Sequence, residues 1–273
     1  FWVTTVPYVH ADHHYMHWWK RGNQSQVVIG CDGGIFYSTD GGVVWVDKNR
    51  NLGLKQFYGA DIHPAAGSPY LIAGAQDNGT HQLKNPGLSY SIEVTGGDGM
   101  HVWVNQQDPN IQMGSYVYNQ YRRSINGGAT WTSNNISGSA GMFVNPYAID
   151  DAQNILYACH NANTLLRWPN INTATASTTV TLTALNGAQI GSLKVSPYTT
   201  NRLFVGTSGG RVVRIDNANA AAPTATNISG AGFPGGFVRS INVGSSDNNL
   251  AATFSNFGVA QVWVTTDGGT NWT

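Results

Sequence analysis

An eight-residue pattern occurs three times in this 273-residue chain, and it restricts the possible folds more than any other feature. Each copy contains a hydroxyl residue, an Asp or Asn two positions later, two glycines and a final tryptophan. The copies begin 86 and 141 residues apart, close to two and three periods of about 45 residues, and this predicts a repeat architecture. The shared positions of the three octets are Ser38, Asp40, Gly42 and Trp45; Ser124, Asn126, Gly128 and Trp131; and Thr265, Asp267, Gly269 and Trp272.

The stretches between the octets keep a common frame of short apolar strands and polar turns. Each has a first strand, a turn rich in Asn, Asp or Pro, a second strand ending in Gly, Ala or Thr, another turn and a third strand. Four strands per unit at this period favour a β-propeller. We predict an all-β fold, a single propeller of four-stranded blades over residues 1–273, with about six units. The expected units are 9–53, 56–97, 98–137, 143–185, 189–229 and 237–273.

The octet itself is expected to be scaffold. Asp or Asn can hydrogen-bond the backbone two residues on, and glycine adopts positive φ without steric cost. The tryptophan would begin the outer strand and fill the space between neighbouring sheets.

The composition excludes several classes of protein. With 14 basic and 14 acidic residues the formal net charge is zero, which gives no electrostatic footprint for nucleic acid or an anionic membrane. No apolar run approaches the roughly 20 residues needed to span a bilayer. Sparse lysine, abundant Asn, Thr, Ser and Gly and only two cysteines lead us to expect an extracellular or cell-surface, bacterial protein.

The octets resemble the Asp-box, or BNR, repeat of sialidases, sortilin-like receptors and xyloglucanase-like glycoside hydrolases. Five further segments resemble secreted bacterial proteins of the sortilin and xyloglucanase-like propeller group. The resemblance covers most of residues 9–137 and implies a propeller that binds or hydrolyses extracellular ligands. The segments are 10–14, 30–34, 56–58, 74–80 and 96–99.

The two ends of the chain leave two interpretations open. Residues 1–8 precede the first unit, and the last unit stops with its octet. Residues 1–8 are either a strand that closes the last blade or the remnant of a preceding blade. We favour a piece of a larger ring, with missing parts of the parent chain packed against this one.

One face of the predicted propeller collects residues suited to binding. Strands alternate in direction, so second-to-third turns and blade-to-blade connections lie on the face opposite the octets. Loops on a rigid scaffold commonly carry function. We predict that this face binds a glycan or an extracellular protein, with no cofactor. The candidate ligand-binding residues are His10, Asp12, His14, Asn78, His101, Tyr118 and His160.

Metal binding is an alternative for part of this set. If residues 10–14 are extended, alternation places His10, Asp12 and His14 on one side of the strand. Spacing does not guarantee the geometry that a metal requires, and the same residues can instead cap strand ends. Whether a metal binds, and which one, stays open.

Glycoside hydrolysis is the second candidate function. It needs two carboxyl groups about 5–5.5 Å apart for retention, or about 6.5–9.5 Å for inversion. Because Glu93 is the only glutamate, the pair would come from Asp32, Asp77 and Asp98, although an Asp before Gly also simply makes a turn. The Asp32 turn resembles the one that carries a catalytic carboxylate in xyloglucanase-like enzymes, whose second carboxylate comes from another propeller.

Binding is therefore the first hypothesis, with a hydrolase module and a structural spacer in a large surface adhesin as alternatives. Sialidase chemistry is disfavoured because no arginine lies near that family's N-terminal arginine motif and Glu93 has no evident tyrosine partner.

Cys31 and Cys159 end equivalent strands of separate blades, so we expect two buried free thiols rather than a disulfide.

Overall fold

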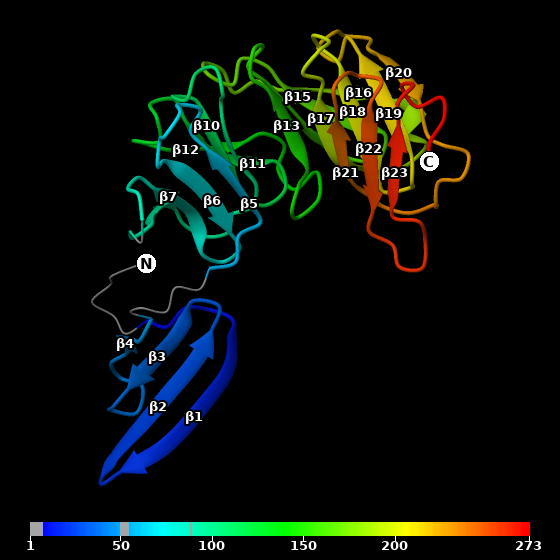
Figure 1. Cartoon of the computed structure of the whole chain (residues 1–273). Coiled ribbons are helices and arrows are strands. Elements are labelled where there is room, and N and C mark those ends of the chain that lie inside the picture. The colour runs from blue at the N-terminus through cyan, green and yellow to red at the C-terminus, as the bar shows by residue number, and fades with distance from the viewer. Residues whose placement is uncertain (1–7, 50–54, 88) are drawn as a thin grey trace. The chain divides into compact units, whose positions relative to one another are not determined.

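A computed structural model describes residues 8–49, 55–87 and 89–273 (Figure 1). The described part is built from antiparallel sheets with one short 3-10 turn, η1 (Thr183–Leu185), which confirms the all-β prediction. It separates into two compact units. The first contains the chain up to His63 and Gly67–Trp103, and the second contains Pro64–Ala66 and Val104–Thr273. The predicted closing strand, residues 1–8, falls almost entirely outside the described residues.

The first unit holds two four-stranded sheets whose strands follow one another in chain order. No helix in the described part is long and apolar enough to cross a membrane. The strands are β1 (His13–Arg21), β2 (Gln24–Cys31), β3 (Gly34–Ser38) and β4 (Val46–Asp47), then β5 (Gly59–Ile62), β6 (Leu71–Ala75), β7 (Gly79–Leu83) and β8 (Ile92–Thr95).

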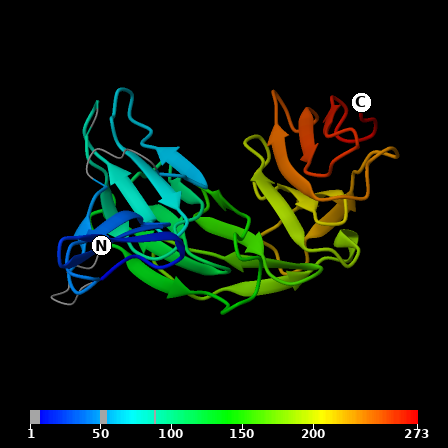
Figure 2. The same ribbon diagram turned by 90° about the horizontal axis from the view of Figure 1, so that it is seen from below.

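The second unit continues the same up-and-down pattern, and Figure 2 shows its sheets succeeding one another from green to red. Its sheets are β9 (Val102–Val104), at the boundary, with β10 (Gln112–Ser115), β11 (Gln120–Ser124) and β12 (Thr132–Asn135); β13 (Tyr147–Asp150), β14 (Ile155–Cys159), β15 (Thr164–Trp168) and β16 (Thr178–Thr181); β17 (Ile190–Val195), β18 (Leu203–Thr207), β19 (Val212–Asp216) and β20 (Thr224–Asn227); and β21 (Val238–Val243), β22 (Leu250–Phe254) and β23 (Val262–Thr265).

Six consecutive sheets with this order are the blades of a β-propeller, as predicted. The last sheet has three strands, and after its octet Thr273 exchanges two backbone hydrogen bonds with Val264, at 2.9 and 3.0 Å. In the third sheet the fourth strand begins at the same place after the octet, where Thr132 pairs with Arg123.

Burial explains why the inner strands of the sheets, such as β14 and β18, are mostly apolar segments of the sequence. Every residue of β14 and of β18 is buried, because neighbouring sheets cover both of their faces. One core cluster joins the fourth and fifth sheets through Tyr157, Leu165, Leu203 and Val213, all without exposed surface. Cys159 is buried in this cluster and Cys31 is only half-buried; both thiols are free, so the expectation of two buried thiols is wrong for Cys31.

Two equivalent arginines hold adjacent sheets of the second unit together. Arg123 on β11 donates from Nη1 to the carbonyls of Ile171 (2.7 Å) and Ala174 (2.9 Å) in the next sheet. Arg167, at the same place on β15, donates to two carbonyls of the sheet after that, those of Ala218 and Ala220. Third-strand arginines are therefore structural here.

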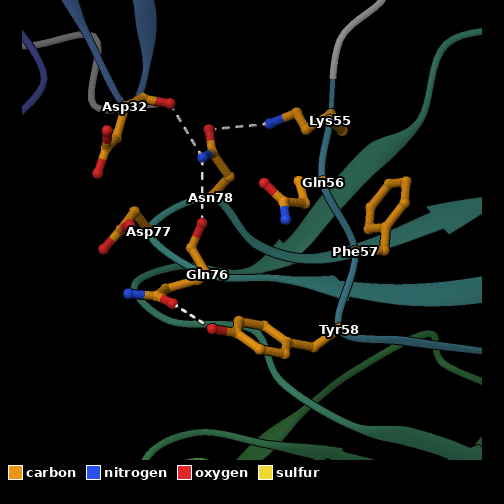
Figure 3. A pocket seen from close by; sticks show the side chains of 8 residues that line it. All are labelled: Asp32, Lys55, Gln56, Phe57, Tyr58, Gln76, Asp77 and Asn78. Atoms are coloured by element: carbon orange, nitrogen blue, oxygen red, sulfur yellow. Dashed lines mark hydrogen bonds between the residues drawn. The ribbon is translucent and has the colours of Figure 1, made fainter. Parts of the chain in front are cut away.

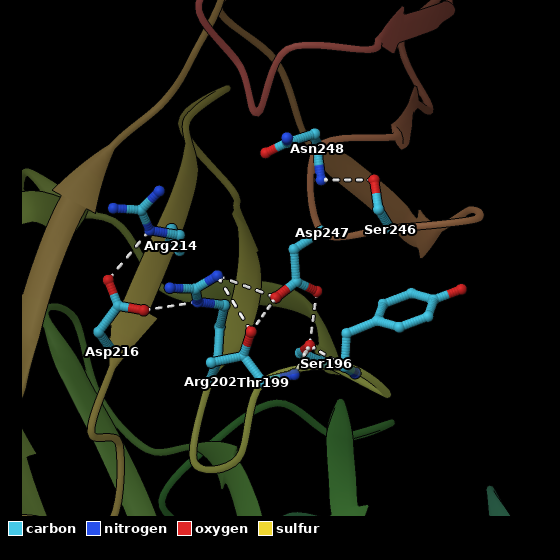
Figure 4. Close-up of polar contacts among 9 residues, drawn as sticks. Ser196, Thr199, Arg202, Arg214, Asp216, Ser246, Asp247 and Asn248 are labelled. Atoms are coloured by element: carbon cyan, nitrogen blue, oxygen red, sulfur yellow. Dashed lines mark hydrogen bonds and ion pairs between the residues drawn. The ribbon is translucent and has the colours of Figure 1, made fainter.

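The fifth and sixth sheets are joined instead by a carboxylate (Figure 4). Asp247, in the turn after β21, accepts hydrogen bonds from Ser196 Oγ (2.5 Å), Thr199 Oγ1 (2.5 Å) and Arg202 Nη1 (2.9 Å) in the turn after β17. Burial opposes ionisation of Asp247, but these three donors outweigh it and lower its pKa. Arg202 also pairs with Asp216, which binds Arg214 in turn.

The octets form one turn three times. The hydroxyl of the first residue donates to the Asp or Asn side chain and accepts the second glycine's N–H, at 2.8 Å from Gly42, 2.9 Å from Gly128 and 3.1 Å from Gly269. The Asp or Asn Oδ1 accepts N–H groups three or four residues on, rather than two as predicted. Both glycines have positive φ in each octet.

The substitution Ser124→Ala should lower the free energy of unfolding by about 1–3 kcal/mol, because it removes the hydroxyl that accepts the buried Gly128 N–H. Urea denaturation measures the change. Ser133→Ala, at an exposed site on β12, is the matched control and should shift stability by less than about 0.5 kcal/mol. Equal effects of the two substitutions would contradict the role assigned to Ser124.

The substitution Asp247→Ala should cost about 2–4 kcal/mol at pH 7, since it leaves three donors without their acceptor. The folded-state pKa of Asp247 is lowered, so its contribution is complete above about pH 4, the ordinary aspartate value, and is lost as pH falls through the folded-state pKa. Unfolding of both proteins at pH 7 and at pH 3 measures this. A difference that stays constant with pH would contradict it.

Candidate functional site

A pocket of about 340 Å³ opens among the loops of the first unit (Figure 3). It is formed by the β2–β3 turn, the β6–β7 turn and the segment leading into β5. These are a second-to-third turn from each sheet and the connection between the two sheets, the kinds of loop on which we expect the binding face. The lining residues are Asp32, Lys55, Gln56, Phe57, Tyr58, Gln76, Asp77 and Asn78.

Tight backbone contacts shape the β6–β7 turn. Asp77 has φ 60°, a left-handed conformation that Asp and Asn tolerate better than most residues. Gly79 follows with φ 72°, and a Cβ there would lie 2.1 Å from the Thr95 carbonyl oxygen, so only glycine fits. The Asp77 N–H donates to the Asp98 carboxylate at 3.1 Å, which fixes the turn against the segment after β8.

Asn78 ties the walls of the pocket together. Its Nδ2 donates to the carbonyls of Asp32 and Gln76, each at 3.2 Å, and its Oδ1 accepts from Lys55 Nζ at 3.2 Å. On the opposite side, the Tyr58 hydroxyl donates to Gln76 Oε1 at 2.7 Å. The Gln56 amide has no hydrogen-bond partner among the described residues and points into the pocket in Figure 3.

Two of the clustered carboxyl groups, Asp32 and Asp77, have pKa values shifted in opposite directions. Oxygens of Asp12, Asp32 and Asp77 lie within 4.8 Å of one another. Burial, then the charge of Asp98, then Asp32 and Asp12 raise the pKa of Asp77 to about 6. A hydrogen bond from His14 is the main cause that lowers the pKa of Asp32. Because the carboxyl oxygens of Asp32 and Asp77 lie within 4.8 Å of each other, the two groups form a coupled pair, and Asp77 is the member that holds a proton up to about pH 6.

The histidines brace the loops around this pair. His10 Nε2 donates to the Asp77 carbonyl at 2.9 Å, His13 Nε2 donates to the His10 carbonyl at 2.9 Å, and His14 contacts the Asp32 carboxylate. The predicted alternation of His10, Asp12 and His14 along one strand is wrong, because β1 begins only at His13 and Asp12 has φ 57°. Among the described residues, the side chains close enough to share a metal ion are Asp12, Asp32 and Asp77, an oxygen set of the kind that Ca²⁺ or Mg²⁺ prefers.

The predicted site residues divide between the two units. Asp32, Asp77 and Asn78 line the pocket, and Asp98, His10, Asp12 and His14 contact or adjoin the lining residues. His101 packs against Gly59 at the start of β5.

The other two predicted residues belong to the second unit and do not line the pocket. Tyr118 packs edge-to-face on Phe143, with ring centroids 6.0 Å apart, and His160 lies in the β14–β15 turn.

Five lining residues were absent from the predicted set: Lys55, Gln56, Phe57, Tyr58 and Gln76. Four of them precede β5 in a connection without periodic patterning. Lys55 falls between the predicted blades 9–53 and 56–97, and residues 56–58 begin the second of them and belong to the segments that carry the family resemblance.

Comparison with known proteins gives the fold alone. No protein-family model matches the chain, and no curated protein matches it. Among solved structures, YCF48 from Cyanidioschyzon merolae superposes with a TM-score of 0.61 at 14% identity, over 98% of this chain and 86% of its own. A structure of YCF48 bound to D1 peptide gives 0.57 at 14% identity, over 98% and 82%.

A chain of the mitotic checkpoint complex crystal structure gives a TM-score of 0.59 at 10% identity, over 91% of this chain and 72% of its own. The sheet order and these similarities define the protein as a β-propeller.

The substitution Asp77→Asn should stabilise the protein above pH 6 and change little at pH 4. The folded-state pKa of Asp77 is raised, so its favourable contribution is complete below about pH 4 and is lost as pH rises through about 6. Asn keeps the left-handed turn and removes the repulsion from Asp98, Asp32 and Asp12. Thermal unfolding at pH 4 and pH 7.5 measures it, and a lower Tm than wild type at pH 7.5 would contradict the assigned repulsion.

Proposed function

We propose that this protein is a binding propeller whose pocket in the first unit holds a peptide segment of a partner protein. The observation that carries the proposal is the pocket itself, formed by second-to-third turns and a connection on the predicted binding face. It is further supported by the peptide-bound state of YCF48, a protein of similar fold.

The lining chemistry suits an extended peptide. The Gln56 amide offers a donor and an acceptor to a backbone, and Phe57 and Tyr58, residues 42% and 43% exposed, offer apolar surface to side chains. Interfaces commonly use an aromatic side chain as the main energetic contact, surrounded by polar groups that fix orientation. Tyr58 has this position, since its hydroxyl is held by Gln76.

Binding of a library of random peptides to the immobilised protein tests the proposal. The substitution Tyr58→Ala should weaken retained peptides by about tenfold or more, the loss expected for a central aromatic contact. Tyr90→Ala is the matched control, because Tyr90 is 93% exposed in the same unit and does not line the pocket. No peptide retained by the wild-type protein, or equal losses in both variants, would refute the proposal.

Glycoside hydrolysis is the second candidate, and one observation favours it. Asp32 and Asp77 lie together with pKa values shifted in opposite directions, which is the arrangement that separates a general acid from an ionised carboxylate. A polysaccharide-hydrolysis screen with wild type and Asp32→Asn tests this candidate. Release of reducing sugar that is lost in Asp32→Asn would establish the enzyme, and no release from any polysaccharide would exclude it within the screen.

Three further proposals concern the identity of the octets, the location of the protein and the alternatives to a peptide ligand. The Asp-box identity of the octets is supported by their shared hydroxyl-to-glycine hydrogen bond. A bacterial extracellular or cell-surface location is supported by the composition. A glycan ligand would use the same polar lining, and a glycan array separates it from a peptide ligand. A spacer role predicts that neither array shows binding.

A further inference from the structure

Tyr118 has a backbone conformation that its residue type disfavours. It lies in the turn between β10 and β11, which is closed by a hydrogen bond from the Gln120 N–H to the Val117 carbonyl at 3.2 Å, and its φ is 56°. A bulky residue at positive φ is strained, and turns that need such a φ ordinarily contain Gly, Asn or Asp. Of the nine residues other than glycine with positive φ in the described part of the chain, the other eight are Asp or Asn.

The equivalent turns of other sheets follow the preference that Tyr118 breaks. Turns between second and third strands have Asp77 (φ 60°), Asn163 (φ 58°) and Gly210 (φ 88°) at positive φ in the second, fourth and fifth sheets. The fold therefore does not require a tyrosine in such a turn. Residues held in strained backbone conformations concentrate at functional sites, where the side chain is needed for another reason.

Packing of the Tyr118 ring does not supply that reason. The ring meets Phe143 edge-to-face with centroids 6.0 Å apart, but Phe143 is itself 44% exposed. The Tyr118 N–H also donates to the Phe143 carbonyl at 3.1 Å, a contact that does not depend on the side chain. We call the two rings the Tyr118 surface. It combines a second-to-third turn with a blade-to-blade connection, the kinds of loop on which we expect the binding face.

The amide next to the Tyr118 surface is used by the scaffold. Asn119 has no exposed surface, and its Nδ2 donates to the carbonyls of Ala140 (2.8 Å) and Cys159 (2.9 Å). Its Oδ1 accepts from the Tyr121 hydroxyl (2.9 Å) and from Asn145 Nδ2 (2.8 Å). These four bonds hold the turn against the next sheet and leave the Asn119 side chain nothing to offer a ligand.

The loops around the Tyr118 surface carry no charged side chain of Asp, Glu, Lys or Arg, as segments 116–120, 137–146 and 160–163 show. Interface cores with few charged residues and an exposed tyrosine bind apolar side chains of a partner. A sugar would instead need hydrogen bonds to its hydroxyl groups, and the adjoining amide is already used. We infer that the Tyr118 surface is a second binding site, in the second unit, for an aliphatic or aromatic side chain of a partner protein.

Peptide pools with one fixed central residue and random flanks test the inference. The full chain carries Tyr58→Ala, so that the pocket of the first unit does not contribute. Pools centred on leucine or phenylalanine should be retained at least about tenfold more strongly than pools centred on glycine or aspartate. Adding Tyr118→Asn should abolish this preference, and adding Phe143→Ala should reduce it. Tyr118→Phe keeps the ring and should retain the preference.

Thermal unfolding separates a binding role from a structural one. Tyr118→Asn removes the backbone strain, so its Tm should equal or exceed that of the parent protein. A Tm lower by about 4 °C or more would overturn the inference, because the ring would then be part of the scaffold. Tyr90→Asn is the matched control, since it makes the same change at an exposed tyrosine outside both sites, and it should leave the preference unchanged.

Three binding results would also overturn the inference. The first is that no apolar pool is retained, and the second is an apolar preference unchanged by Tyr118→Asn, which would place the contact elsewhere. The third is binding to a glycan array that is lost in Tyr118→Asn, which would make the ligand a sugar. None of these results decides the proposed function of the pocket, because that depends on the comparison of wild type with Tyr58→Ala.

Discussion

Burial of the middle strands on both faces is the constraint on which the rest of the structure depends. Every residue of strands such as β14 and β18 is buried, so these strands hold mostly apolar or small residues and cannot accommodate an unpaired charge. Polar chemistry is thereby confined to turns and connections. The pocket follows this division, because its lining comes from two turns and one connection rather than from the faces of the sheets.

The same constraint explains what the sequence could and could not predict. Octets and apolar segments repeat because they are fixed by packing, so the propeller and its approximate unit number could be predicted. Asp32 and Asp77 could be placed near each other since equivalent turns of neighbouring sheets meet on one face. The segment from Lys55 to Tyr58 has no periodic pattern, and its position depends on tertiary contacts. The strand expected through His10 and Asp12 does not form, because Asp12 has a left-handed backbone conformation and β1 begins only at His13.

The aspartates fall into two groups by the hydrogen bonds that their carboxylates accept. Asp40 and Asp267 accept backbone N–H groups within their octets and have lowered pKa values, about 2 for Asp267. These carboxylates are part of the turn. Asp77 instead faces other carboxyl groups, and its own N–H is used by Asp98. Because a turn needs only an acceptor oxygen, which Asn126 also supplies, and gains nothing from clustered acids, the raised pKa marks Asp77 as a residue that scaffold requirements do not explain.

The contacts between sheets also differ in what can disrupt them. Arg123 and Arg167 bind uncharged carbonyls, so no proton can remove their acceptors. The Asp247 cluster depends on a negative charge that acid neutralises. Acidification therefore acts unevenly along the second unit: it weakens the contact between the fifth and sixth sheets and leaves the arginine–carbonyl contacts of the third, fourth and fifth sheets intact. The apolar core that the fifth and sixth sheets share does not depend on charge, so acid loosens this contact without removing it.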